Sequence, residues 1–347
     1  MKSNLLSRSN YYQVGSFVVS LLFIAIVIAL SGVSPFQVVA SLWDGAFGTA
    51  DQFARVLSTL APLLLCASGL VFTFTAGLYN LGIEGQIAVG AIATTALLRL
   101  LEGAIPAPLV IALALVAGTI GGAIWGLFAG VLNVYGKVNE IFAGLGLNFV
   151  AQGLTLYLIF GPWKRPGVAS MSGTELLNES LWLSTFGNTE ASPISLILAA
   201  LAVVVTVVVI RGTHFGLKLR AVGQNLRASY VLGIPAVRQL LSSFAICGAF
   251  AGIAGALQVV GVFHRLIPNI SSNLGFLALL VVMLVGFNAL FIVPVAFFFS
   301  ALNIGSLQLP LALQLESSLA GVIQGTLVLF AVLGRGFSER KNGLKNS

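Results

Sequence analysis

The chain has 347 residues, of which 58% are hydrophobic and 8% are charged, and its formal net charge is +7. Its mean hydropathy is +1.03. Soluble globular proteins carry about 25% charged residues, so this composition excludes a soluble fold and indicates an all-α, polytopic integral membrane protein. Because the basic residues lie beside apolar segments, the positive charge favours contact with the lipid bilayer over nucleic-acid binding.

Apolar runs of about 20 residues, long enough to cross the hydrocarbon core as helices, recur along the chain. No interval between them predicts a separate soluble domain, so residues 1–347 are expected to form a single transmembrane domain. The eighth run is short and is expected to be a broken or re-entrant helix. We expect about ten transmembrane helices, near residues 14–31, 56–76, 83–101, 107–134, 141–160, 193–211, 240–262, 274–287, 289–305 and 318–334.

The distribution of Lys and Arg predicts the orientation, because positive residues tend to remain on the cytoplasmic side. With the N-terminus inside, 12 of the 17 basic residues fall in cytoplasmic segments. Both termini and the loop at about 212–240 are then cytoplasmic, and the loop at about 161–192 lies outside. That outer loop contains the amphipathic stretch TELLNESLWL, which predicts either a short helix at the membrane surface or a plain exposed connector.

Glycines recur every fourth residue in the fourth apolar run, and this spacing places them on one helix face. A bare face of this kind lets a second helix approach closely, so we expect helix packing rather than a ligand site here. The glycines are Gly118, Gly122, Gly126 and Gly130, and a similar pattern follows at Gly248 and Gly252.

A first polar cluster interrupts the apolar sequence at Asn80, Glu84 and Gln86, in the motif NLGIEGQ. Neighbouring glycines permit a helix break, and broken helices of transporters line the substrate path. We therefore expect these three side chains to face the substrate path. A tight turn that leaves Glu84 solvated in the cytoplasm remains open as the alternative.

A second cluster places Asn148 and Gln152 four residues apart on one face of the fifth helix. This face either lines the substrate path or forms hydrogen bonds between helices. Both interpretations remain open at this point.

The stretch 212–235 is long, polar and basic between two apolar blocks. Asn225 is a good helix N-cap, residues 226–232 predict a compact helix, and Gly233 before Ile234 is a good stop. A short helix in a cytoplasmic loop is expected to dock a partner.

The known signatures of enzymes and metal sites do not match. His214 and His264 fall on opposite sides of the membrane in the predicted topology, so they cannot share a metal ion. The nearest candidate phosphate loop, from Gly130 to Lys137, has one residue too many and lacks the following Ser or Thr. The chain is therefore not expected to be an enzyme or to hydrolyse ATP by itself.

Three motifs, NLGIEGQ, VNEIFAGLGLNFVA and FGLKLRAVGQN, occur in this order within residues 55–335. Together they resemble permease subunits of bacterial ABC importers, in the branched-chain-amino-acid-type branch that handles nucleosides and simple sugars. The chain departs from the pattern at Leu226 and at Phe287–Asn288, and the second departure lies beside the short eighth run.

The resemblance implies a permease subunit that forms half of a translocation pathway in the bacterial inner membrane and pairs with a second, different permease. It also implies a substrate-binding lipoprotein outside and cytoplasmic ABC ATPase subunits, which use the ATP, so the chain itself needs no cofactor. Residues of the cytoplasmic loop are implied to contact the ATPase and couple ATP hydrolysis to transport: Arg220, Gly223, Asn225, Arg227, Ala228 and Gly233.

Two other classes of function remain as alternatives. A self-contained secondary transporter would use Glu84 for ion coupling and would need no ATPase. An intramembrane enzyme or a scaffold is disfavoured by the lack of paired catalytic residues at one depth. For the leading hypothesis the amides favour a nucleoside or a related small polar solute as cargo, and a sugar fits nearly as well.

Overall fold

The computed structural model describes residues 2–165, 167, 172–187, 189–286 and 289–343, with side chains from residue 15 to 334 except residue 17. These residues form helices and loops without a β-strand, as expected. The helices are α1 (Lys2–Leu30), α2 (Pro35–Phe47), α3 (Ala50–Thr75), α4 (Ile83–Leu101), α5 (Ala107–Val134), α6 (Glu140–Phe160), η1 (Glu179–Leu181), α7 (Pro193–Gly212), α8 (His214–Gln224), α9 (Leu226–Val231), α10 (Ala236–Leu257), η2 (Gln258–Phe263), α11 (Leu274–Leu284), η3 (Ala289–Phe291), α12 (Ile292–Gly305), η4 (Ser306–Gln308), α13 (Leu309–Leu313) and α14 (Leu319–Gly343).

Each of the ten predicted apolar runs contains a helix, which confirms the polytopic membrane fold. Within the described residues, 7 helices are long and apolar enough to cross a membrane, or up to 8 if α1 and α2, bent by 98°, count as one span. The predicted count of about ten crossings therefore stays a prediction. With 11 residues, α11 extends about 16 Å and is too short to cross the bilayer, as expected.

Helices α2 and α8 are among the helices that were not predicted from the sequence. Helix α2 begins with Pro35 in its first turn, a position that proline favours, and it buries Val38 and Leu42 on one face. Thr213 caps α8, whose Leu219 and Val222 are buried three residues apart. Both helices thus carry recognisable start signals and a short amphipathic pattern.

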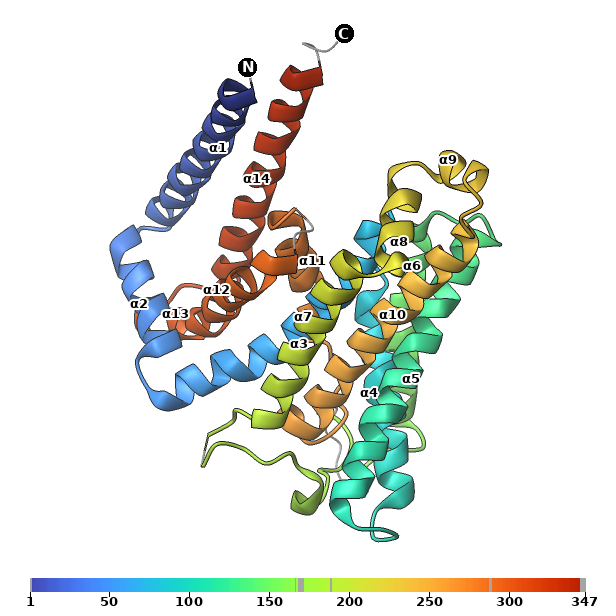
Figure 1. The fold of residues 1–347 in the computed structure, drawn as a ribbon. Coiled ribbons are helices and arrows are strands. Elements are labelled where there is room, and N and C mark those ends of the chain that lie inside the picture. The colour runs from blue at the N-terminus through green and yellow to red at the C-terminus, as the bar shows by residue number, and fades with distance from the viewer. Residues whose placement is uncertain (1, 166, 168–171, 188, 287–288, 344–347) are drawn as a thin grey trace. The chain divides into compact units, whose positions relative to one another are not determined.

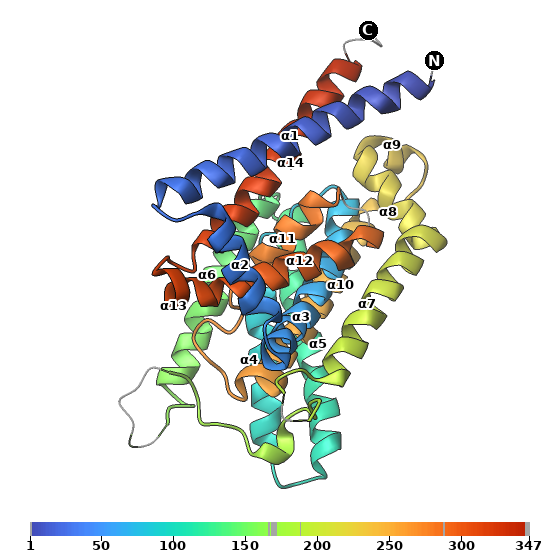
Figure 2. The ribbon, with the colours of Figure 1, turned by 90° about the vertical axis from the view of Figure 1, so that its left-hand side faces the viewer.

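The helices gather in two compact units. Unit 1 comprises the described parts of residues 1–56, 283–286 and 297–347. In this unit α1 and α14 pack against each other (Figures 1 and 2). Their apolar side chains and those of α2 form one core, with Ile28, Leu42 and Leu327 among the buried residues.

Unit 2 comprises the described parts of residues 57–282 and 287–296, and α4, α5 and α10 run side by side at its centre (Figure 1). Glycines make this close packing possible. A Cβ on Gly122 would lie 2.6 Å from Cα of Gly252, and a Cβ on Gly90 of α4 would lie 2.7 Å from the Gly252 carbonyl oxygen. Gly252 of α10 therefore lies where the three backbones meet.

The rest of the predicted glycine face lies against α10 as well. A Cβ on Gly118 would lie 3.0 Å from Cβ of Ala256, and one on Gly126 would lie 3.1 Å from Cα of Gly248. Gly130 faces the side chain of Phe244, at 3.0 Å from Cδ2 to the same added atom. The whole face thus contacts one neighbouring helix, which is a packing arrangement.

The outer loop (residues 161–192) and the helices α8 and α9 lie at opposite ends of unit 2 (Figures 1 and 2). Within the described residues of this loop, the stretch 174–183 is neither a continuous helix nor a fully exposed connector. Its helical part is the single turn η1, and Leu177, Leu181 and Leu183 are buried. The loop contacts η2, because the Leu183 amide donates to the Val260 carbonyl at 3.0 Å.

An aromatic contact holds the same loop. The ring of Trp182 stacks on the imidazole of His264 with centroids 3.9 Å apart, and the Trp182 indole donates to the Leu177 carbonyl. Partial burial lowers the pKa of His264, because it disfavours the charged imidazole. His264 therefore has a packing role in this structure.

Candidate functional site

The break that the sequence predicts at NLGIEGQ separates α3 from α4. Gly77 follows the end of α3 with a φ of +79°, a conformation that glycine adopts without strain. The Leu78 amide donates to the Thr73 carbonyl at 2.9 Å and closes the end of α3. The chain then turns through residues 79–82 before α4 begins at Ile83.

Two of the predicted polar residues stabilise this break by pairing with each other. Asn80 Nδ2 donates to Gln86 Oε1 at 3.1 Å, and Gln86 Nε2 donates to Asn80 Oδ1 at 3.2 Å. Asn80 Nδ2 also contacts Cys247 Sγ of α10 at 3.1 Å. Both side chains are fully buried, so they satisfy each other inside the protein and do not line the cavity described below.

Asn148 of α6 holds the start of α4 from the other side. Its Nδ2 donates to the Leu81 carbonyl at 2.8 Å, and its Oδ1 accepts from the Gly85 amide at 2.8 Å. One amide side chain thus satisfies an amide and a carbonyl at the beginning of α4, where backbone groups lack helical partners. The interhelical hydrogen bonds that the sequence left open for Asn148 are therefore present.

Glu84 lies in the first turn of α4 and is 8% exposed. Its Oε1 accepts from the Phe276 amide at 2.9 Å, in the first turn of α11. The alternative of a solvated cytoplasmic turn is therefore wrong. A carboxylate in this position satisfies an unpaired amide at the helix start and is stabilised by the helix dipole.

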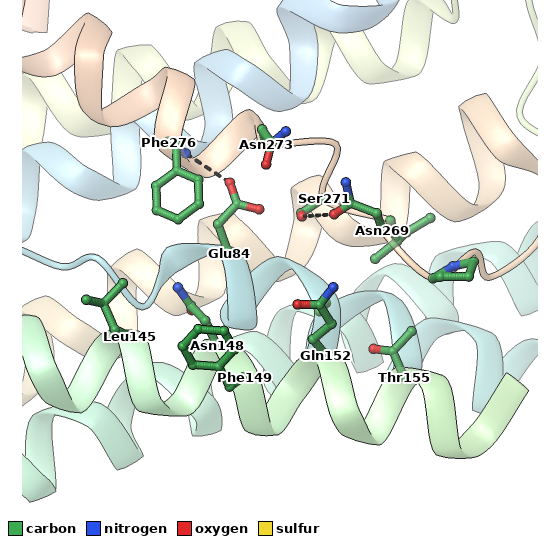
Figure 3. A pocket seen from close by; sticks show the side chains of 13 residues that line it. Glu84, Leu145, Asn148, Phe149, Gln152, Thr155, Asn269, Ser271, Asn273 and Phe276 are labelled. Carbon is green, nitrogen blue, oxygen red and sulfur yellow. Dashed lines mark hydrogen bonds between the residues drawn. The ribbon is translucent and has the colours of Figure 1, made fainter.

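Glu84 faces a cavity of about 390 Å³ in unit 2, between α4, α6 and the loop that leads into α11 (Figure 3). Gln152 and Asn148 line it from one face of α6, and their spacing predicted this shared face. The cavity combines a carboxylate, several amides and two phenyl rings. Its lining residues are Glu84, Ala88, Leu145, Asn148, Phe149, Gln152, Thr155, Pro268, Asn269, Ile270, Ser271, Asn273 and Phe276.

Of the five residues predicted for the substrate path, the structure brings Glu84, Asn148 and Gln152 to the cavity. It places Asn80 and Gln86 elsewhere. The sequence reasoning missed the polar residues of the loop before α11, namely Asn269, Ser271 and Asn273. The signal was the polar stretch directly before a helix too short to span the membrane, since broken helices mark binding sites.

The short helix predicted at 226–232 is present as α9, which confirms its start and its stop. Asn225 Oδ1 accepts from the Ala228 amide at 3.0 Å. At the other end, Gly233 has a φ of +71°, and the Ile234 amide donates to the Ser229 carbonyl at 3.0 Å. This is a Schellman-type helix end, in which a glycine in the left-handed conformation closes the helix.

The preceding helix, α8, is tied to the membrane-spanning part of unit 2. Arg220 donates from its guanidinium to the Ile210 carbonyl at the end of α7. A Cβ on Gly223 would lie 3.0 Å from the Gly77 nitrogen, so the end of α8 touches the backbone at the break between α3 and α4. The two glycines thus join α8 to the segment that carries Glu84.

The exposed surface of α9 carries both a basic side chain and apolar side chains. Arg227 and Ala228 are exposed on it. Apolar side chains are exposed as well, although apolar groups are unfavourable in water, and a cluster of them indicates an interaction surface. They are Leu226, Tyr230, Val231 and Leu232, and Val231 is 88% exposed.

Replacing Asn225 with alanine is expected to loosen α9, because a lost N-cap costs about 1 kcal/mol and a six-residue helix has little other support. Hydrogen exchange of the amides at 226–231 should accelerate about fivefold. Asn225→Asp keeps an acceptor and should exchange at the original rate. Equal rates in the alanine and aspartate variants would show that the cap contributes nothing.

The sequence matches the family described as "Branched-chain amino acid transport system / permease component" over residues 52–332. It is 28% identical over 312 residues to the guanosine ABC transporter permease protein NupP of Bacillus subtilis, covering 88% of each chain. It is 28% identical to the nucleoside ABC transporter permease protein NupB of Lactococcus lactis, over 81% of this chain and 79% of that one. The glucose ABC transporter permease protein TsgB13 of Haloferax volcanii is 30% identical, over 86% and 79%.

These matches favour an ABC permease over a secondary transporter or an intramembrane enzyme, because permease components are not enzymes themselves and act with the other components of a transport system. Together with the apolar helices they make the chain a multi-pass membrane protein. Since the family match covers most of the sequence, the chain belongs to the family of permease components of branched-chain amino acid transport systems.

Proposed function

We propose that this chain is one of two permease subunits of an ATP-driven ABC importer for nucleosides, and that the cavity beside Glu84 belongs to the solute path. Two of the relatives described above are named for guanosine or nucleoside transport. The cavity volume of about 390 Å³ lies in the range of small-molecule sites. The cavity therefore has the size that a nucleoside requires.

The chemistry of the lining carries the proposal. Phe149 is 74% exposed and Phe276 is 40% exposed, and both line the cavity. Exposed phenyl rings offer flat apolar surfaces on which a nucleobase stacks. The amides of Gln152, Asn269 and Asn273 offer donors and acceptors for the ribose and for the edge of the base.

A sugar is the second candidate, because the relative from Haloferax volcanii is named for glucose. A sugar would use the amides and Glu84 in the same way and would gain less from the flat face of a phenyl ring. The two phenyl rings are therefore the observation that favours a nucleoside.

The proposed partners follow from the positions of α8, α9 and the outer loop in unit 2. Helices α8 and α9 lie at the end of unit 2 opposite the outer loop, and the exposed surface of α9 suits an ATPase groove. We place this end in the cytoplasm of a bacterial cell, with the chain in the inner membrane. A separate ATPase uses the ATP, a second permease completes the pathway, and a binding lipoprotein delivers solute to the outer side.

Uptake by the reconstituted complex of both permeases, the ATPase and the binding lipoprotein tests this function. Radiolabelled guanosine should accumulate only with ATP inside the vesicle, without response to a protonophore, and excess nucleosides should compete while glucose does not. Arg227→Glu should reduce uptake, because the ATPase contact is proposed to involve the surface of α9. Accumulation driven by a proton gradient without ATP would refute an ABC importer, and competition by glucose alone would make it a sugar importer.

Glu84→Ala is expected to reduce guanosine uptake about tenfold, because it removes both a polar group of the cavity and the acceptor that holds the first turn of α11. Glu84→Gln retains an acceptor oxygen and should lose less. Initial uptake rates, normalised to the amount of complex in the vesicles, provide the measurement. Normal rates in both variants would show that Glu84 only shapes a turn.

A further inference from the structure

The cavity beside Glu84 contains an acidic side chain and no basic one among its described lining residues. Among the described residues that line it, Glu84 is the only one with an ionisable side chain. The other polar groups are neutral amides and hydroxyls, such as those of Gln152 and Asn273 (Figure 3). No lysine, arginine or histidine of the described chain lines the cavity to offset a carboxylate charge.

Hydrogen bonds from backbone amides partly offset the cost of burying this carboxylate in its ionised form. Oε1 accepts the Phe276 amide at 2.9 Å at the start of α11, where the helix dipole stabilises negative charge. A Cβ on Gly275 would lie 2.8 Å from Oε1, so the absence of a side chain there lets the carboxylate reach the helix. Backbone amides thus hold the carboxylate in place, and no basic side chain of the described lining would cancel its negative charge.

We infer that Glu84 gives the cavity a selectivity for charge: neutral or cationic solutes that donate hydroxyl or amino hydrogens enter, and anions do not. Charge acts over a longer range in a cavity of low dielectric constant than in water. A nucleoside is admitted and its 5′-phosphate is repelled. The inference deepens the proposed function, on which it rests for placing the cavity in the solute path.

Cysteine modification measures this selectivity without transport. Gln152 is exposed and lines the cavity, so Gln152→Cys reports on it. The purified complex is treated in detergent with two methanethiosulfonates of similar size, a cationic trimethylammonium-ethyl reagent and an anionic sulfonatoethyl reagent. The reference site is Ser184→Cys, exposed in the outer loop. The native Cys66 and Cys247 are buried, and the parent complex gives their background.

At each site, the modification rate with the cationic reagent is divided by the rate with the anionic reagent. This ratio should be about three to ten times higher at position 152 than at position 184. Glu84→Gln should bring this factor close to one, and Glu84→Asp should keep it high. A value near one in both the protein with native Glu84 and the Glu84→Asp variant would overturn the inference, and so would a value unchanged by Glu84→Gln. If Glu84→Gln closes the cavity to both reagents, the values with native Glu84 and Glu84→Asp decide.

This experiment and the uptake assay fail independently. A charge-selective cavity in a complex that does not import guanosine would refute the nucleoside function and leave the selectivity standing. Guanosine import together with equal modification rates for the two reagents would refute the charge selectivity and leave the nucleoside function standing.

Discussion

Replacing Gly252 with alanine is expected to destabilise the permease by about 1–3 kcal/mol and to lower its melting temperature by about 5 °C or more. The added Cβ would overlap the Gly118 carbonyl oxygen of α5 and would lie 3.1 Å from Cα of Gly122. These neighbours are backbone atoms of a packed helix, so no side-chain rotation relieves the overlap. Gly252→Leu should prevent recovery of a monodisperse protein.

The matched control is Gly153→Ala in the middle of α6, where an added Cβ would have no atom within 4 Å. Alanine favours helix more than glycine does, so this variant should melt at the original temperature or slightly above it. Thermal unfolding of both variants in the same detergent provides the comparison. Equal melting temperatures for Gly252→Ala and Gly153→Ala would show that α4, α5 and α10 can accommodate a Cβ at Gly252 without loss of stability.

Replacing Gly223 with valine is expected to uncouple transport, with uptake reduced tenfold or more while the ATPase continues to hydrolyse ATP. The new side chain would meet the Thr75 carbonyl and would displace the end of α8 from the break between α3 and α4. The backbones of Gly77 and Gly223 already lie close together, since a Cβ on Gly77 would be 3.1 Å from the Gly223 carbonyl oxygen. Little space is therefore left for a valine side chain between them. A motion of α8 and α9 would then no longer move the segment that carries Glu84 as a rigid body.

Gly212→Ala serves as the control for this experiment, because Gly212 ends α7 near the same loop and an added Cβ would have no atom within 4 Å. The measurement is the number of solute molecules taken up per ATP hydrolysed by the reconstituted complex. It should stay at the original value in Gly212→Ala and fall in Gly223→Val. If Gly223→Val transports with the original ratio, the contact between α8 and the break transmits nothing.

Local features of the sequence predicted α9 because its ends depend on residues within the same short segment. The cap bond of Asn225 spans three residues, and the bond that closes the helix at Ile234 spans five. Such short-range patterns require no knowledge of the rest of the fold. Helices α2 and α8 show the same kind of signal and were predictable on the same grounds.

The polar motif NLGIEGQ shows where local reasoning ends. Glu84 and Gln86 lie two residues apart in α4, so they point to nearly opposite sides of the helix. One reaches the cavity and the other is buried against Asn80. The sequence identified the motif, but the side that faces a solute depended on which neighbour packs against each side.

The sequence by itself determined the membrane class, the positions of the apolar runs and the capped helix α9, because composition and short-range hydrogen bonds decide them. Only the tertiary structure decided the cavity. Glu84 accepts its hydrogen bond from a residue 192 positions away, and Asn148 holds a turn 67 positions before it. Contacts at such separations arise from how helices pack, and no local pattern in the chain specifies them.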